Sequence, residues 1–228
     1  MKFPDFDKVN TEHGFGLVCR DEVLDFERIF KEGADKFVRN GWRMDDFYVK
    51  KLGSDEYNAV PATRFVNSVK LANIACTEKN TFANIPNPIG LIYSGTGADL
   101  VARESKGYFI AEYMPGLRVL HEFKNFTPPQ QKKFFKTLGM ALRQFREQGL
   151  FLGEFAPKDL LVEKIDDFNL TFVDTEYVTD AGYSRITAAG ALERQIVQFT
   201  SDYYPFLEDL QYTPEEIHTA EDLVFGKL

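Results

Sequence analysis

The chain has 228 residues, enough for one domain or a tight two-lobed unit. Its 44% hydrophobic and 27% charged residues are typical of a globular protein, and the formal net charge of −8 argues against nonspecific binding to nucleic acid, whose phosphates would be repelled. Two cysteines and three scattered histidines give neither a disulfide framework nor the ligand spacing of a zinc site.

No targeting or membrane-spanning segment is evident in the sequence. The start, MKFPDFDKVN, lacks the apolar stretch of a signal peptide, and no run approaches the roughly 20 apolar residues of a membrane span. We therefore expect a cytoplasmic protein. The aromatic cluster at 203–206 offers a surface for a protein partner or a peripheral membrane contact, although buried packing is the preferred interpretation.

The first half of the chain favours strands. Residues 1 to about 25 look irregular, and 26–52 suggest strands broken by turns at Gly33 and Asn40-Gly41, since Asn-Gly is a strong hairpin signal. Apolar residues at helical spacing predict a helix over 62–76. After an extended segment imposed by two prolines, three more strands are expected, at 89–93, 99–103 and 108–113.

The second half favours helices. Thr127 followed by two prolines predicts a helix start, and Gly149 predicts its end. Two short strands and a helix through 192–199 follow, and a capping box at Thr213 begins the last helix. The expected fold is α+β, with a strand-rich lobe over 1–114 and a reduced helical lobe over 115–228 that meet at Pro115-Gly116.

The segment 149–177 carries the chemistry. Glu154 and Asp159 stand five positions apart before an apolar triplet, and a second apolar run, 170–173, ends on Asp174. Each acid also has a structural alternative as a turn, cap or solvated loop residue. Three carboxylates at the ends of short strands beside a loop are nevertheless typical of a site that holds a metal-bound phosphate.

Four segments resemble the protein-kinase-like superfamily, over roughly residues 28–205. Residues 109–116 look like its hinge, 154–162 like its catalytic loop, 172–174 like the strand that ends in the metal-binding Asp, and 48–50 like the strand with the phosphate-binding Lys. The small size and the lack of a long segment after Asp174 look most like the lipopolysaccharide-core (Kdo and heptose) kinases and RIO-type small kinases. The resemblance implies a two-lobed fold that uses ATP and Mg²⁺.

The resemblance also implies residue roles. Asp174 and Asp159 would bind Mg²⁺, and Glu154 would accept the proton of the acceptor hydroxyl. Lys50 would bind the nucleotide phosphates, with Lys51 as the rival because a shift of one residue reverses which side chain faces which side of a strand.

The backbone of Glu112 and Met114 would hold the adenine. The sequence departs from the family at Glu154, where the family has Asp, and at Asp159, where it has Asn. Leu152 replaces a His, and Gly14-Phe15-Gly16 stands too far upstream to be a convincing glycine-rich loop. Glu56 is the nearest carboxylate to pair with the lysine.

We therefore expect an ATP- and Mg²⁺-dependent phosphotransferase that acts on a hydroxyl of a saccharide or small molecule, with a lipopolysaccharide-core sugar as the leading acceptor. The alternative is a pseudokinase that serves as a nucleotide-binding or protein-interaction module, because the changes at 152, 154 and 159 alter residues that catalysis uses.

Overall fold

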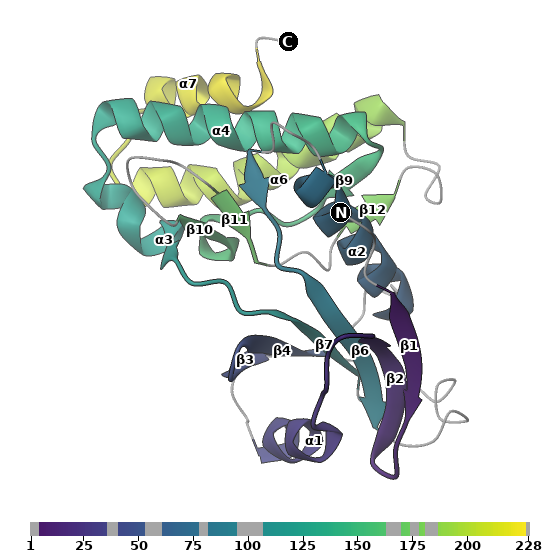
Figure 1. Ribbon diagram of the computed structural model, residues 1–228. Helices are drawn as coiled ribbons and strands as arrows, with labels where there is room; N and C mark the ends of the chain where they lie inside the picture. The colour runs from purple at the N-terminus through teal and green to yellow at the C-terminus, as the bar shows by residue number, and fades with distance from the viewer. Residues whose placement is uncertain are drawn as a thin grey trace. The chain divides into compact units, whose positions relative to one another are not determined.

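The computed structural model describes residues 5–35, 41–52, 61–77, 82–94, 107–162, 170–173, 178–180 and 187–226. The fold is α+β and divides into two compact units, drawn in Figure 1. Unit 1 comprises 1–69 and 86–113, and unit 2 comprises 70–85 and 114–228. Unit 1 is rich in strands and unit 2 is rich in helices, as the sequence predicts.

Unit 1 is built on an antiparallel sheet in the order β1-β2-β6-β7-β4-β3. Its strands are β1 (Phe6–Asn10), β2 (Gly14–Cys19), β3 (Gly41–Met44), β4 (Phe47–Leu52), β6 (Pro88–Ser94) and β7 (Gly107–Glu112). Apolar residues alternate between its two faces because successive side chains of a strand point to opposite sides.

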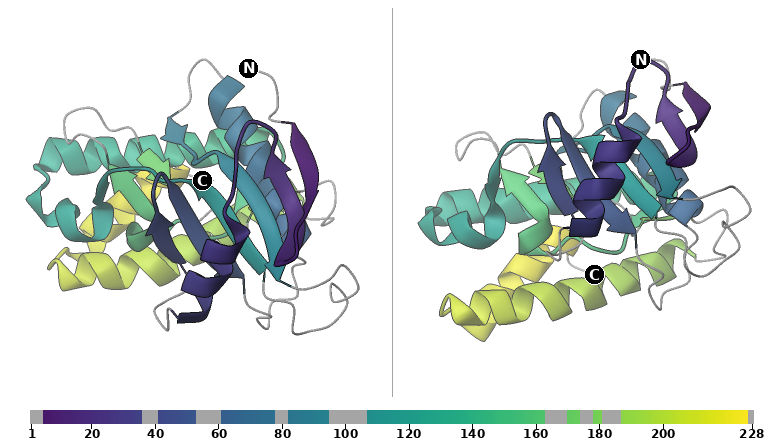
Figure 2. Two further views of the ribbon diagram at one scale, coloured as in Figure 1. Left: turned by 60° about the horizontal axis from the view of Figure 1, so that its bottom comes forward. Right: turned by 90° about the horizontal axis from the view of Figure 1, so that it is seen from below.

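Each face of this sheet packs against a helix. Ile92 and Tyr108 form a cluster with Ile29 of α1 (Phe26–Asp35), the helix that Figure 2 shows crossing the sheet. On the other face, Phe109 clusters with Phe65 from α2 (Pro61–Thr77). The sheet is therefore covered on both sides by helical residues.

Unit 2 has a core of aromatic and aliphatic side chains. Its helices are α3 (Val119–Glu122), α4 (Pro128–Glu147), α6 (Ala188–Asp209) and α7 (Pro214–Phe225), with short 3₁₀ segments η2 (Phe123–Asn125) and η3 (Pro157–Asp159). One small sheet has the order β5-β11-β10-β8 and a second pairs β12 with β9. Their strands are β5 (Ala83–Asn84), β8 (Leu117–Arg118), β9 (Leu150–Leu152), β10 (Leu160–Val162), β11 (Leu170–Phe172) and β12 (Val178–Asp180).

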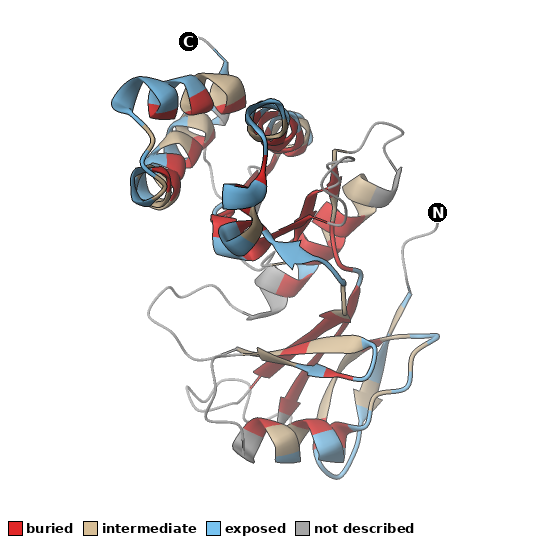
Figure 3. Cartoon of the chain, turned by 90° about the vertical axis from the view of Figure 1, so that its left-hand side faces the viewer, coloured by how far each residue is buried: buried red, intermediate tan, exposed pale blue. Residues whose placement is uncertain are grey.

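The helices of unit 2 are amphipathic, with buried residues on one side and exposed residues on the other (Figure 3). Phe134 of α4 and Phe199 of α6 are fully buried in one cluster. The second half of α2 joins the same cluster through Leu71 and Ala72, which is why 70–85 group with the C-terminal residues. The cluster also takes in Tyr203 and Phe206, so the 203–206 aromatics serve packing, as preferred from the sequence.

Helices α4 and α7 begin where the sequence predicts. Thr127 and Thr213 each form a capping box, with Gln130 and Glu216 respectively. Gly149, which follows α4, has φ 77°. The predictions for α2, β6 and β7 are also confirmed.

Three predictions for the N-terminal half are wrong. The first 25 residues are not irregular, because they form the β1–β2 hairpin. Residues 26–35 form helix α1 rather than strand, so the described part of this half has two helices instead of one. The β3–β4 hairpin turns at Asp45-Asp46, with Asp45 at φ 54°, and not at Asn40-Gly41.

Gly41 lies against the end of the Tyr48 side chain. A Cβ at this position in β3 would lie 2.2 Å from the hydroxyl oxygen of Tyr48. The expected strand at 99–103 lies outside the described residues. In the part of the chain that the structure describes, no helix is long and apolar enough to cross a membrane.

Candidate functional site

The loop between β9 and β10 carries two of the predicted site residues, Glu154 and Asp159. Pro157 starts the 3₁₀ turn η3, and the backbone N–H of Asp159 donates to the carbonyl of Ala156 at 2.8 Å. This turn buries the side chain of Asp159, which is 8% exposed, whereas Glu154 is partly exposed. A buried carboxylate needs a compensating partner, so Asp159 is the more informative of the two.

Helix α6 holds this loop on both sides of Glu154. The amide Nε2 of Gln195 donates to the carbonyl oxygen of Leu152 at 3.3 Å, and the hydroxyl of Tyr203 donates to the carbonyl oxygen of Phe155 at 2.9 Å. Both donors are buried. The backbone on either side of Glu154 is therefore fixed by buried hydrogen bonds, each of which is costly to break.

A half-buried arginine extends this network to α4. The guanidinium of Arg146 donates to Oε1 of Gln195 at 2.6 Å, so Gln195 accepts from one element while it donates to another. Burial lowers the pKa of Arg146, with repulsion from Arg143 as a smaller cause. An arginine remains protonated despite such a shift, so Gln195 bonds a cation.

Asp159 also contacts the strand that precedes Asp174. The backbone N–H of Val173 donates to the carbonyl oxygen of Asp159 at 3.0 Å, next to the β10–β11 pair. This contact joins the η3 turn to the end of the second short strand. Asp174 itself lies outside the described residues.

Asp159 is one of the few buried polar or charged residues among those described. Its Oδ2 atom is buried and accepts no hydrogen bond from the described residues, although the side chain takes part in other interactions. Complete burial raises the pKa of Tyr203. The negative charges of Asp202 and, less strongly, of Asp159 raise it further. Carboxylate oxygen in a buried position fits the ligand preference of Mg²⁺.

A full metal cluster is not formed by the described residues alone. No group of three or more His, Cys, Asp or Glu side chains within them could hold a metal ion. Glu154 and Asp159 belong to one loop, and the third predicted carboxylate, Asp174, is not described. The structure therefore places two of the three predicted acids on the loop between β9 and β10.

The two candidate lysines lie on opposite faces of the unit 1 sheet. Lys50 pairs with Phe109 across the β4–β7 ladder, and Lys51 pairs with Tyr108. Directly paired residues of antiparallel strands point to the same face. Lys50 thus lies on the face that packs against α2, and Lys51 on the face that packs against α1.

The helix after the lysine strand carries no acid. Residues 61–77 contain neither Asp nor Glu, so α2 cannot supply the carboxylate that pairs with the lysine in protein kinases. Glu56, the candidate named from the sequence, lies outside the described residues. From β4 through α2, the described residues therefore provide no glutamate that could pair with the lysine, as protein kinases require.

The predicted hinge residues differ in their backbone bonding. The N–H of Glu112 donates to the carbonyl of Asn87 at 2.9 Å, and its side chain accepts from the Asn87 amide at 2.8 Å. The N–H of Met114 has no backbone partner among the described residues. Met114 is thus the better candidate to donate to a ligand, and Glu112 has only its carbonyl to offer.

Gly14 and Gly16 have a structural explanation. They lie in β2, where a Cβ would approach the carbonyl oxygens of Tyr93 and Leu91 in β6 to 2.2 and 2.3 Å. The strands could not pair so closely with a larger residue there. These glycines therefore allow β2 to pair closely with β6.

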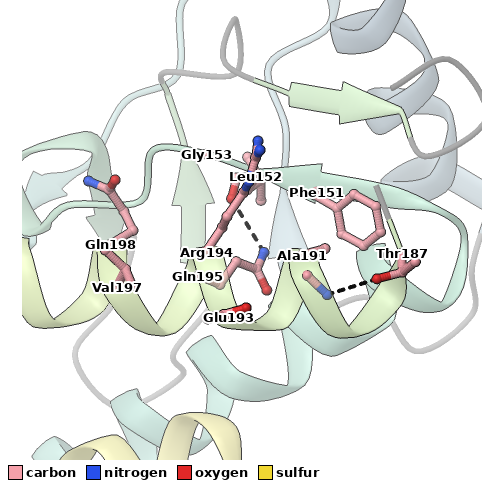
Figure 4. Close-up of a pocket in the computed structure, with 11 residues that line it drawn as sticks. Phe151, Leu152, Gly153, Thr187, Ala191, Glu193, Arg194, Gln195, Val197 and Gln198 are labelled. Carbon is pink, nitrogen blue, oxygen red and sulfur yellow. Dashed lines mark hydrogen bonds between the residues drawn. The ribbon is translucent and has the colours of Figure 1, made fainter. Parts of the chain in front are cut away.

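A pocket that the sequence did not indicate lies in unit 2. It has a volume of about 740 Å³ and is lined by residues of β9 and the first half of α6, together with Gly153 (Figure 4). Its lining includes Thr187, which caps α6, and Ala191, Arg194 and Gln198, which stand three or four positions apart. This spacing puts them on one face of the helix. The sequence of the helix alone does not tell whether such a face lines a pocket or packs into a core.

Similarity to known proteins is found among solved structures, at low sequence identity. No protein-family model matches the chain, and no curated protein matches it. Among solved structures, it is similar to the bifunctional kinase-methyltransferase WbdD (12% identity, TM-score 0.44), over 77% of this chain and 35% of that one. It is also similar to the Cydia pomonella granulovirus kinase PK-1 (10% identity, TM-score 0.48), over 88% of this chain and 91% of that one. The chain thus spans about a third of the WbdD chain.

The order of elements agrees with the family resemblance. A strand with Lys50 is followed by helix α2, β7 leads into unit 2 at Tyr113–Met114, and a loop with Glu154 and Asp159 precedes two short strands. Protein kinases place their lysine strand, the helix after it and the catalytic loop in this order. The chain has an α+β fold in which these elements follow that order.

Proposed function

We propose that the protein is an ATP- and Mg²⁺-dependent phosphotransferase that acts on a hydroxyl of a small molecule or saccharide. The observation that carries the proposal is the β9–β10 loop, in which Glu154 is flanked by two buried hydrogen bonds from α6 and Asp159 is buried beside the end of β11. A fixed backbone around a carboxylate is what general base catalysis requires.

In the proposed reaction, the oxygen of the acceptor hydroxyl forms a bond to the γ-phosphorus of ATP. The bond from that phosphorus to the β–γ bridging oxygen breaks, and ADP leaves with its electron pair. The hydroxyl proton passes to the carboxylate of Glu154. Glu has one methylene more than the Asp of the family, so the position of the acceptor must match the longer side chain.

The remaining predicted residues would bind the nucleotide and the metal. Asp159 and Asp174 would hold Mg²⁺, which would neutralise charge on the phosphates when bound. Lys50 would bind the phosphates, and the backbone of Glu112 and Met114 would bind the adenine. A saccharide such as a lipopolysaccharide-core sugar is the first acceptor to test.

One observation favours a second candidate, a pseudokinase that binds nucleotide or a protein without catalysis. Helix α2 has no acidic residue, and in protein kinases the pair between the lysine and a helix glutamate must be in place for activity. A pseudokinase that binds nucleotide differs from the first candidate in turnover, and one that binds only a protein differs in nucleotide binding as well.

A thermal-shift titration followed by a turnover assay tests the proposal. ATP with Mg²⁺ should stabilise the wild-type protein, by about 2.7 kcal/mol at a ligand concentration of 100 times Kd. Asp159→Ala and Asp174→Ala should each reduce that stabilisation. Transfer of label from γ-labelled ATP to a panel of sugars should be seen with wild type and lost in Glu154→Gln. Stabilisation without turnover for any sugar would support the pseudokinase, and no stabilisation at all would contradict the phosphotransferase and the nucleotide-binding form of the pseudokinase.

A further inference from the structure

The pocket between β9 and α6 adjoins the candidate catalytic loop within unit 2. Gly153 lines the pocket, and the next residue in the chain is Glu154. A general base must come within about 3 Å of the hydroxyl that it deprotonates. A molecule in this pocket would therefore lie next to the backbone that carries the proposed base.

The size of the pocket suits a small molecule. Its volume of about 740 Å³ falls in the range of roughly 300–1,000 Å³ that small-molecule sites occupy. Phe151 and Leu152 line it from β9, and Ala191 lines it from α6. This apolar wall stands beside polar residues of α6, which can position a ligand by directed contacts.

The polar groups of the pocket include a single guanidinium. Arg194 is exposed, and among the described residues its side chain has neither an ion pair nor a hydrogen bond. Figure 4 shows it extending from α6 toward Gly153. An arginine in this state can bind a carboxylate or a phosphate through two parallel hydrogen bonds.

The other polar groups suit hydroxyls. Gln198 uses its amide Nε2 to donate to Asp202 at 2.6 Å, so its carbonyl oxygen remains for a donor from a ligand. Thr187 accepts from the N–H of Gly190 at 3.1 Å, which leaves its own O–H to donate. The carboxylate of Glu193 offers two further acceptors. Gln195, in contrast, is already used by Arg146 and Leu152.

We infer that this β9–α6 pocket is the acceptor site, and that it takes a hydroxylated small molecule that carries a carboxylate or a phosphate bound by Arg194. The inference rests on the proposed function, because it supplies the substrate class for the same loop. The anionic group orients the molecule, and its hydroxyls contact Gln198, about one turn of α6 beyond Arg194.

The test is an NMR titration of the ¹⁵N-labelled full chain. The probes are glucose 6-phosphate and glucuronate as anionic sugars, glucose as the neutral match, inorganic phosphate, and ATP with Mg²⁺. The two anionic sugars should shift the amide signals of 187–198, with an affinity at least about tenfold above that of glucose. Inorganic phosphate should bind more weakly than glucose 6-phosphate, because it lacks the hydroxyl contacts.

Arg194→Gln should weaken binding of the anionic sugars by at least about tenfold. Arg143→Gln is the matched control, since this exposed arginine of α4 lies outside the pocket and should leave binding unchanged. Equal binding by wild type and Arg194→Gln would overturn the inference, as would equal affinity for glucose or the absence of shifts in 187–198 with every sugar.

The ATP arm separates this inference from the proposed function. ATP that binds elsewhere while no sugar shifts 187–198 would leave the phosphotransferase standing and refute the pocket assignment. Sugar binding at Arg194 in a protein that binds no ATP would refute the phosphotransferase and retain an anionic-sugar site. ATP that itself shifts 187–198 in an Arg194-dependent way would make the pocket a nucleotide site and overturn its assignment to the acceptor.

Discussion

The hydroxyl of Tyr203 in α6 donates a 2.9 Å hydrogen bond to the carbonyl oxygen of Phe155, the residue after Glu154. Tyr203 is fully buried and its ring stacks on Phe199 at 4.6 Å between centroids. A buried donor that is fixed by its own packing holds its acceptor in one place. Helix α6 is thereby the element that positions the backbone beside the proposed base.

Tyr203→Phe should lower the free energy of unfolding by about 1–3 kcal/mol, because it leaves the buried carbonyl of Phe155 without its donor. Denaturant unfolding measures the change. Tyr204→Phe is the matched control, since Tyr204 is more exposed and bonds Glu221 instead of the loop. An equal or larger loss in Tyr204→Phe would contradict the role given to Tyr203.

Gln195→Met should cost about 2–3 kcal/mol, because the substitution removes a hydrogen bond to the charged Arg146 and a second to the Leu152 carbonyl. We expect phosphotransfer to fall as well, through the loosened loop. Gln198→Met, three residues on, should cost less than about 1 kcal/mol, since Gln198 is only partly buried. Equal unfolding midpoints for both variants would refute the buried network.

Lys50→Met should weaken binding of ATP by at least about tenfold in the thermal-shift titration, because it removes the proposed phosphate partner. Lys51→Met is an adjacent control on the opposite face of β4 and should bind ATP as wild type does. The assignment fails if Lys51→Met loses affinity and Lys50→Met retains it.

Gly139→Ala should destabilise the contact between α4 and α7 by about 1–3 kcal/mol. A Cβ at Gly139 would lie 2.3 Å from the carbonyl oxygen of Val224, so α7 must move despite the better helix propensity of Ala. Met140→Ala, one position later and 41% exposed, should change stability by less than about 0.5 kcal/mol. A stabilised Gly139→Ala protein in thermal unfolding would contradict this close packing.

Stability should fall between about pH 10 and 12. Burial raises the pKa of Tyr93 from 10.0 to about 12, so the folded state holds its proton where the unfolded state has lost it. The contribution is fully present below pH 10 and is lost as pH rises toward 12, at up to about 1.4 kcal/mol per pH unit. Tyr93→Phe should show a shallower loss than wild type in chemical unfolding over this range, and identical slopes would contradict the prediction.

The sequence alone predicted the elements whose signals are local. Helices α4 and α7 carry their capping residues at Thr127 and Thr213, and a cap acts within one turn of the chain. The order of strands, helix, joint and acidic loop was also evident, because each segment has its own pattern. That order was sufficient for the two-unit α+β fold and for Glu154 and Asp159 as candidates on one loop.

Other elements were missed even though part of their signal was present. Phe26, Ile29, Phe30 and Gly33 have helical spacing, which was outweighed by turn residues nearby. Strand β2 was not predicted because Gly14 and Gly16 lower strand propensity, while the close approach of β6 requires them.

What only the tertiary structure decided depends on partners far apart in the chain. The pairing of β4 with β7 placed Lys50 on the α2 face and Lys51 on the α1 face, and a strand sequence does not specify its register. The hydrogen bonds from Gln195 and Tyr203 to the carbonyls on either side of Glu154 join residues more than 40 positions apart. No local sequence pattern predicts such contacts. The pocket with Arg194 exists because α6 packs along β9, and a concave surface is a property of two packed elements rather than of either sequence.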